Sequence, residues 1–168
     1  GGADDFFGGL IRALYDQFPA AEAEALAVDN AITFYVAGHE TTANALAWTI
    51  YLLAAQPGLQ EEARAEAVAA LDGDVTTLAD RLPLLRQILD EAMRLYPPAP
   101  RFDREAKAAD RLGDAEIAAG DLISLWPWVM HRHRKLWDNP DVFDHIRFTP
   151  EAKAKLHRFQ YLPFGGGP

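Results

Sequence analysis

Hydrophobic positions in the first half of the chain recur every three or four residues, which is the spacing of one face of an α-helix. Helices are predicted over residues 5–18, 20–55, 59–71 and 84–96. Proline or glycine follows each of them closely, as expected where a helix ends; Pro57 and Gly58 are predicted to end the longest. The second half of that helix is apolar on almost every face, and we therefore expect it to be buried.

The pattern changes in the second half of the chain, where short apolar stretches alternate with turn residues. Residues 101–125 are predicted to form two or three short strands, with turns at Gly113 and Gly120. A short helix is predicted over residues 126–137, and residues 138–168 are interpreted as a long ordered loop. The prediction is a mainly α fold with a small β region.

The length and net charge of the chain exclude some classes of protein. A chain of 168 residues fits one domain or a part of one, and a net charge of −9 argues against nucleic acid as a partner, because phosphate binding depends on Lys and Arg. No apolar run approaches the roughly 20 residues of a transmembrane helix, and we expect a cytoplasmic protein. The absence of cysteine excludes disulfides and cysteine-based zinc sites within the chain.

A stripe of small residues with aromatic ends runs along one face of the long predicted helix. Its members are Phe34, Ala37, Gly38, Thr41, Ala45 and Trp48. A glycine inside a helix costs about 1 kcal/mol relative to alanine, and here it leaves room for a flat group to approach the backbone. A planar cofactor and a close crossing of two helices both fit this pattern.

Glu40 and Thr41 place a carboxylate and a hydroxyl in the middle of the same predicted buried helix. Such groups are costly to bury unless they are hydrogen-bonded. The Thr41 hydroxyl can bond to a carbonyl one turn earlier, which has no functional meaning. The other interpretation is proton delivery, with Thr41 facing a cofactor pocket and Glu40 linked to solvent through water.

Glu91 and Arg94 lie three positions apart on an otherwise apolar predicted helix. On a surface, such a pair contributes only about 0.2–0.5 kcal/mol. If the pair is buried, the five donors of the guanidinium need further partners. Arg147 could then complete a triad with Glu91.

The remaining basic residues allow two interpretations each. Arg104 follows the proline-rich break and could clamp a carboxylate of a cofactor, or it could be solvated. Residues 131–135 form a basic cluster, which is either a solvated face or a surface for an acidic electron-donor protein. A metal site from His131 and His133 is not predicted, because no carboxylate stands at ligand spacing.

Four segments, in their order along the chain, resemble motifs of the cytochrome P450 family of haem-thiolate monooxygenases. Residues 37–42 are similar to the oxygen-activation motif of its long central helix, and residues 91–94 to its Glu-x-x-Arg motif. Residues 143–148 resemble the segment that supplies the third member of the charged triad, and residues 162–168 the start of the haem-binding loop. Arg104 matches the position of a haem-propionate arginine.

This resemblance implies that residues 1–168 are a single partial domain, the C-terminal part of the cytochrome P450 fold, with the N-terminal half absent. It implies haem b (iron protoporphyrin IX) as cofactor of the complete protein. The axial cysteine would come just after Pro168, so no metal ligand is expected in this chain. The expected cofactor contacts are Ala37, Gly38, Thr41, Arg104, Phe164 and Gly165.

The resemblance also implies roles for the charged residues. Glu40 and Thr41 would be catalytic and would manage protons, whereas Glu91, Arg94 and Arg147 would be structural. The implied reaction is insertion of oxygen from O2 into a small organic substrate, with electrons from a ferredoxin or flavoprotein. We expect the fragment to be inactive alone.

Two alternatives remain open at this point. The first is a haem peroxygenase or dehydratase-type relative with the same fold, against which the retained pair Glu40 and Thr41 argues. The second is a cofactor-free helical module, in which the small-residue stripe packs against a protein helix.

Overall fold

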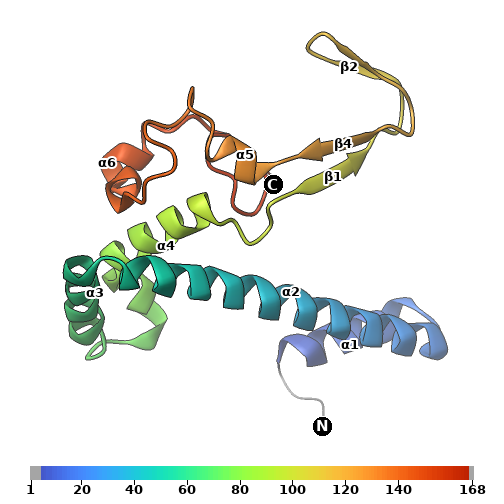
Figure 1. The fold of residues 1–168 in the computed structure, drawn as a ribbon. Helices are drawn as coiled ribbons and strands as arrows, with labels where there is room; N and C mark the ends of the chain where they lie inside the picture. The colour runs from blue at the N-terminus through green and yellow to red at the C-terminus, as the bar shows by residue number, and fades with distance from the viewer. Residues whose placement is uncertain (1–4, 167–168) are drawn as a thin grey trace. The chain divides into compact units, whose positions relative to one another are not determined.

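The structure is a computed structural model that describes residues 5–166 (Figure 1). These residues fall into two compact units, the first ending at Ala43 and the second beginning at Asn44. The mainly α prediction with a small β region is confirmed. The elements are α1 (Phe6–Gln17), α2 (Ala20–Ala54), α3 (Pro57–Ala70), η1 (Val75–Arg81), α4 (Pro83–Leu95), β1 (Phe102–Glu105), β2 (Asp110–Leu112), β3 (Ala115–Ile117), β4 (Leu122–Leu125), α5 (Pro127–Met130), η2 (His145–Phe148) and α6 (Pro150–Lys153).

In the first unit, α1 packs against the first part of α2 (Figure 1). Asp5 caps α1, since its Oδ1 accepts a hydrogen bond from the Gly8 amide at 2.7 Å. The rings of Phe6 and Phe7 meet that of Phe34 edge-on, with centroids 5.1 and 6.3 Å apart. Aromatic contacts of this geometry hold the two helices together.

The expectation that the second half of α2 is buried is wrong for this chain. Leu46 is 53% exposed, and Ile50 and Tyr51 are 65% and 64% exposed. In the second unit, this part of the helix contacts other elements through Leu53, which packs against the core of α3 and α4, and through Trp48, which stacks on the Tyr96 ring. An apolar pattern shows that a helix face is suited to burial, but burial also requires another part of the protein that packs against that face. Between Asp5 and Gly166, no helix is both long and apolar enough to cross a bilayer.

The core of the second unit lies between α3 and α4. It contains Leu59, Ala63 and Ile88, with Leu53 from the end of α2 packed against it. Pro57 does not only end α2, because it also begins α3, where its missing N–H costs nothing in the first helical turn.

The N-terminus of α4 is held by a side chain from α3. The two carboxylate oxygens of Glu66 accept hydrogen bonds from the amides of Leu84 and Leu85, each at 2.9 Å. Those amides have no partner within their own helix. This contact fixes α4 against α3 and thereby places Glu91 and Arg94.

Four strands, rather than two or three, form two antiparallel pairs, and β2–β3 lies between β1 and β4 in the chain (Figure 1). In the first pair Arg104 lies opposite Ile123, and in the second Arg111 lies opposite Glu116. Gly113 turns the second pair with φ of 60°, a conformation that favours glycine.

The predicted helix over residues 126–137 is only one turn long, α5. After Met130 the main chain continues in turns, in which the amides of Arg132 and His133 donate to the carbonyls of Val129 and Met130, each at 3.2 Å, in place of α-helical bonds. The predicted loop over residues 138–168 contains two short elements, η2 and α6. Asp144 caps the first and Thr149 the second, each through a side-chain oxygen that accepts from an amide.

Candidate functional site

A buried ion pair lies at the centre of the candidate site. Glu91 and Arg94 face each other on α4, and both side chains are fully buried. Arg94 donates from Nε to Oε2 at 2.7 Å and from Nη2 to Oε1 at 2.9 Å. This two-pronged arrangement matches the planar fork of a guanidinium to a carboxylate. The alternative of a surface pair is therefore excluded.

All five donors of Arg94 are used. Besides the two bonds to Glu91, Nη1 donates to the carbonyl oxygens of His131 and Pro140, each at 2.7 Å, and Nη2 donates to that of Val142 at 3.2 Å. A buried guanidinium is tolerated only when it is satisfied in this way. One side chain of α4 thus fixes the main chain at three places between residues 131 and 142.

Arg147 joins this network more loosely. Its Nε lies 3.6 Å from Glu91 Oε1, and its Nη2 donates to the carbonyl oxygen of Asn139 at 3.2 Å. Glu91 Oε1 also accepts from the Asp144 amide at 2.8 Å. The structure therefore brings together the three residues of the predicted triad, with Arg147 held by an ion pair and no hydrogen bond to Glu91.

The protonation of Glu91 is set by opposing effects. Burial raises the pKa of the Glu91 carboxyl above its usual value, and the hydrogen bonds and positive charge of Arg94 work against that rise. The carboxylate form suits the three residues around it, because Arg94 and the Asp144 amide donate hydrogen bonds and Arg147 is cationic. Removal of one partner would leave a buried group unsatisfied, which costs more than the pair contributes.

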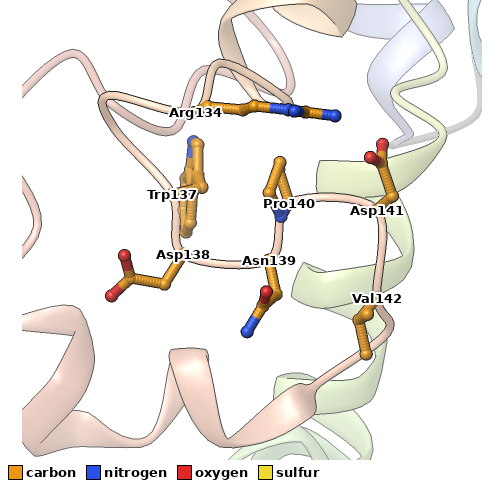
Figure 2. Close-up of a pocket in the computed structure, with 7 residues that line it drawn as sticks. All are labelled: Arg134, Trp137, Asp138, Asn139, Pro140, Asp141 and Val142. Carbon is orange, nitrogen blue, oxygen red and sulfur yellow. The ribbon is translucent and has the colours of Figure 1, made fainter.

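The loop of residues 138–142 contacts this network, and Figure 2 shows its course. Its main-chain carbonyls point inward to Arg94 and Arg147, while the side chains of Asp138, Asn139 and Asp141 are exposed. The ring of Trp137 covers the Arg94 guanidinium at 5.1 Å.

Between Trp137, Arg134 and this loop lies a hollow of about 390 Å³ that opens on the surface (Figure 2). None of the residues predicted to bind the cofactor lines this hollow. It is therefore not the predicted cofactor site.

Arg104 and the last loop share a second, smaller hollow. Arg104 on β1 and Gly165 and Gly166 near the end of the chain line a space of about 80 Å³, together with Phe102 and Leu162. Gly165 has φ of 89°, which favours glycine, and a side chain there would point toward the Phe102 ring at 3.6 Å.

The guanidinium of Arg104 is exposed, and its Nη1 donates to the carbonyl of Asp103 at 2.8 Å. Within residues 5–166 it forms no ion pair with a carboxylate. Phe164 is 70% exposed.

The other predicted cofactor contacts lie in the first unit. Ala37, Gly38, Glu40 and Thr41 are on α2, and a Cβ added to Gly38 would meet no atom of the described residues within 4 Å. The alternative of a close helix crossing at Gly38 therefore has no support among residues 5–43. Glu40 is exposed and Thr41 is half-buried.

The hydrogen bond of Thr41 does not by itself indicate a function. Its Oγ1 donates to the carbonyl of Ala37 at 2.6 Å. Thr33 and Thr49, on the same helix, make the same bond to the residue four positions earlier, at 2.8 and 2.7 Å. A special role for Thr41 must rest on its position next to Glu40 and Gly38.

The predicted solvated basic face at residues 131–135 is partly wrong. His131 is fully buried, and Arg132 is half-buried with its guanidinium 4.6 Å from the Trp128 ring. His133, Arg134 and Lys135 are exposed as expected. His131 is buried because its main chain is drawn inward by Arg94.

The imidazole of His131 accepts a hydrogen bond in this environment. Its Nε2 accepts from the amide of Leu162 at 2.7 Å, and its ring lies 5.3 Å from that of Tyr161. Tyr161 donates from its hydroxyl to the carbonyl of Asp90 at 3.0 Å and to its Oδ1 at 3.1 Å. Burial, with Asp90 nearby, raises the pKa of the Tyr161 phenol above its usual value, so it remains a donor.

Comparison with known proteins shows which family this chain belongs to. The family model described as Cytochrome P450 matches residues 23–168. The chain belongs to the cytochrome P450 family. Thromboxane-A synthase of Rattus norvegicus is 37% identical over 158 residues, which cover 89% of this chain and 30% of that protein. Cyclooctatin synthase of Streptomyces melanosporofaciens is 35% identical over 169 residues, which cover 99% of this chain and 37% of that protein.

The fold agrees with solved cytochrome P450 structures. The haem domain of cytochrome P450DA superimposes with a TM-score of 0.73 at 39% identity, over 80% of this chain and 31% of that one. The chain thus spans about a third of the length of the relatives it matches. Members of the cytochrome P450 family bind haem b, and haem b is expected in the complete protein.

The residues of this chain fit such a cofactor. Arg104 offers an exposed guanidinium without a carboxylate partner among the described residues, and a haem carries propionates that such a group can bind. The hollow beside it is lined by two glycines and apolar side chains, and at about 80 Å³ it would meet only the edge of a flat apolar ring.

Sequence reasoning missed His131, Trp137 and Tyr161. Trp137 and Tyr161 lie in a stretch where hydrophobic residues do not recur at a regular spacing. In such a stretch, a large aromatic residue itself indicates burial. Nothing in the sequence distinguishes His131 from the basic residues that follow it.

The stability of the complete protein is expected to fall in acid because of His131. Burial, together with the positive charge of Arg94 and Arg132, lowers the pKa of His131 from 6.5 to about 4. The folded pKa is below the unfolded one, so the neutral imidazole contributes stability above pH 6.5 that is lost as the pH falls toward 4. The difference corresponds to about 3 kcal/mol.

Denaturant unfolding of the wild type and of His131→Gln at neutral pH and near pH 4 measures this contribution. Glutamine does not titrate, so the wild type is expected to lose about 3 kcal/mol more than the variant. Equal losses in both proteins would show that His131 titrates as in the unfolded chain.

Proposed function

We propose that this chain is part of a haem-dependent monooxygenase, in which oxygen from O2 is inserted into a small organic substrate. The observation that carries the proposal is the shared hollow of Arg104 and Gly165, which are far apart in the sequence, in a chain of this family. We also propose that residues 1–168 belong to one larger domain, which is supported by the share of the relatives' length that they span.

The cofactor would be held mainly by the second unit. Arg104 would pair with a haem propionate, and Phe164 and Gly165 would lie against the ring. Glu91, Arg94 and Arg147 would not touch it; their role would be to hold the surrounding loops. The chemistry that haem supplies when bound is the activation of O2 at its iron.

Proton delivery is proposed for Glu40 and Thr41. The Oγ1 of Thr41 gives its own hydrogen to the Ala37 carbonyl and keeps lone pairs free. It can therefore accept a hydrogen bond from a water and hold it near Gly38, whose missing side chain leaves that space open. Glu40 is exposed and can exchange protons with solvent and pass them through such a water.

Electrons would come from a ferredoxin or flavoprotein. The exposed Arg134 and Lys135 give this acidic chain a local positive surface, which suits an acidic donor protein. Exposed charges of this kind mainly affect the rate of association, which falls as salt rises.

Labelled oxygen tests the proposed reaction. The full-length protein, supplied with an electron-donor system and a panel of organic substrates, is expected to incorporate one atom of labelled O2 into its product. The same incubation without the donor is expected to give no product. Product formed with peroxide but not with O2 and donor would contradict the proposal and favour a peroxygenase.

A further inference from the structure

His131 has no part in the reaction as proposed, although it is one of the most deeply buried polar residues in the part of the chain that the structure describes. Its side chain is fully buried. Nε2 accepts a hydrogen bond, so the ring proton is on Nδ1. Nδ1 forms no hydrogen bond of good geometry among the described residues, although main-chain groups of Met93 and Arg94 lie near the ring.

His131 connects two parts of the fold through its main chain and its side chain. Its carbonyl accepts from Arg94 Nη1 at 2.7 Å, and its amide donates to the Pro127 carbonyl at 2.7 Å. The main chain of His131 is therefore fixed to the buried ion pair and to α5. Its side chain then extends to the Leu162 amide at 2.7 Å.

Leu162 is where the last loop begins. The preceding residue, Tyr161, is anchored separately to Asp90 on α4. The residues that follow include Gly165, which lines the hollow with Arg104. A shift of the Leu162 main chain would therefore move the lining of that hollow, while Tyr161 keeps the preceding segment on α4.

We propose that His131 is a positioning residue, whose imidazole Nε2 fixes the Leu162 main chain and so sets where Phe164 and Gly165 meet the cofactor. This inference rests on the proposed cofactor site. It assigns to His131 a link from the buried ion pair to the last loop that Glu91, Arg94 and Arg147 do not make themselves.

Hydrogen exchange of the full-length protein tests the link without any need for turnover. His131→Leu removes the acceptor, and exchange of the Leu162 amide is expected to become about tenfold faster, which corresponds to the loss of one hydrogen bond. His131→Gln places an amide oxygen near the position of Nε2 and is expected to restore most of the protection. Residues 83–95 are expected to be unchanged in both variants.

His133→Leu is the matched control, because His133 is an exposed histidine close by in the same segment. It is expected to leave the exchange of Leu162 unchanged. Unchanged exchange of Leu162 in His131→Leu, or an equal acceleration over residues 83–95, would overturn the proposal.

A second readout reports on the cofactor site. In His131→Leu, a smaller fraction of the reduced CO complex is expected to have the spectrum of thiolate-ligated haem, and His131→Gln is expected to recover it. An unchanged fraction in His131→Leu would contradict the positioning role. A wild type without haem would refute the proposed function, whereas the exchange result would still test the link itself.

The wild type offers a measurement that does not depend on a variant that folds. The ¹⁵N shifts of the His131 imidazole, assigned by their loss in a His131 variant, are expected to show a neutral ring with its proton on Nδ1 at pH 7. A proton on Nε2, or a charged ring, would overturn the proposal.

Discussion

Replacement of Glu91 by alanine is expected to destabilise the complete protein by about 3–5 kcal/mol. The change leaves the fully buried guanidinium of Arg94 without its carboxylate, and it removes the acceptor of the Asp144 amide. The loops held by Arg94 lose their support, so haem content is expected to fall together with stability. Denaturant unfolding and the haem absorbance of the purified protein measure the two effects.

Glu61→Ala provides the matched control. Glu61 pairs with Arg64 at the same spacing and at 3.4 Å, but both side chains are largely exposed. Its loss is expected to cost no more than about 0.5 kcal/mol and to leave haem content unchanged. Similar effects of the two substitutions, or a Glu91→Ala protein with normal haem content, would contradict the structural role assigned to the buried pair.

Replacement of Thr41 by alanine is expected to lower the amount of product formed per electron consumed. A positioned proton-transfer group contributes about 10²–10⁴-fold to a rate. Because water can replace part of this contribution, we expect product per electron to fall by about tenfold. Electron consumption and product yield, measured in the same incubation, give the ratio directly.

Thr33→Ala is the control for this effect. Thr33 makes the same hydrogen bond to its own helix at 2.8 Å, two turns earlier on α2. Both substitutions remove that bond, so they should have similar effects on stability, whereas only Thr41→Ala should change the yield. An unchanged yield per electron in Thr41→Ala would exclude the proton-delivery role.

Most helix positions could be predicted from the sequence, because proline acts locally. Pro19 separates α1 from α2, and Pro97 follows the end of α4. Pro57 was harder to interpret, since proline is compatible with the end of one helix and the start of the next. The one-turn length of α5 could not be predicted, because no proline or glycine follows Met130 closely to mark its end.

Burial was the least predictable property. The apolar pattern in the second half of α2 predicted a buried helix, yet Leu46 and Ile50 are exposed within this chain. For the buried ion pair, the spacing of Glu91 and Arg94 was visible in the sequence. The carbonyls that satisfy Arg94 were not, because every residue carries one. The burial of His131 could not be predicted for a related reason, because the partner of its side chain is a main-chain amide.

The binding of CO to the reduced full-length protein requires haem and reports its axial ligand, and it is therefore the decisive measurement. We predict one haem per chain and the spectrum of a thiolate-ligated CO complex. A correctly folded protein that binds no haem would contradict it, and a CO complex without thiolate ligation would do so as well.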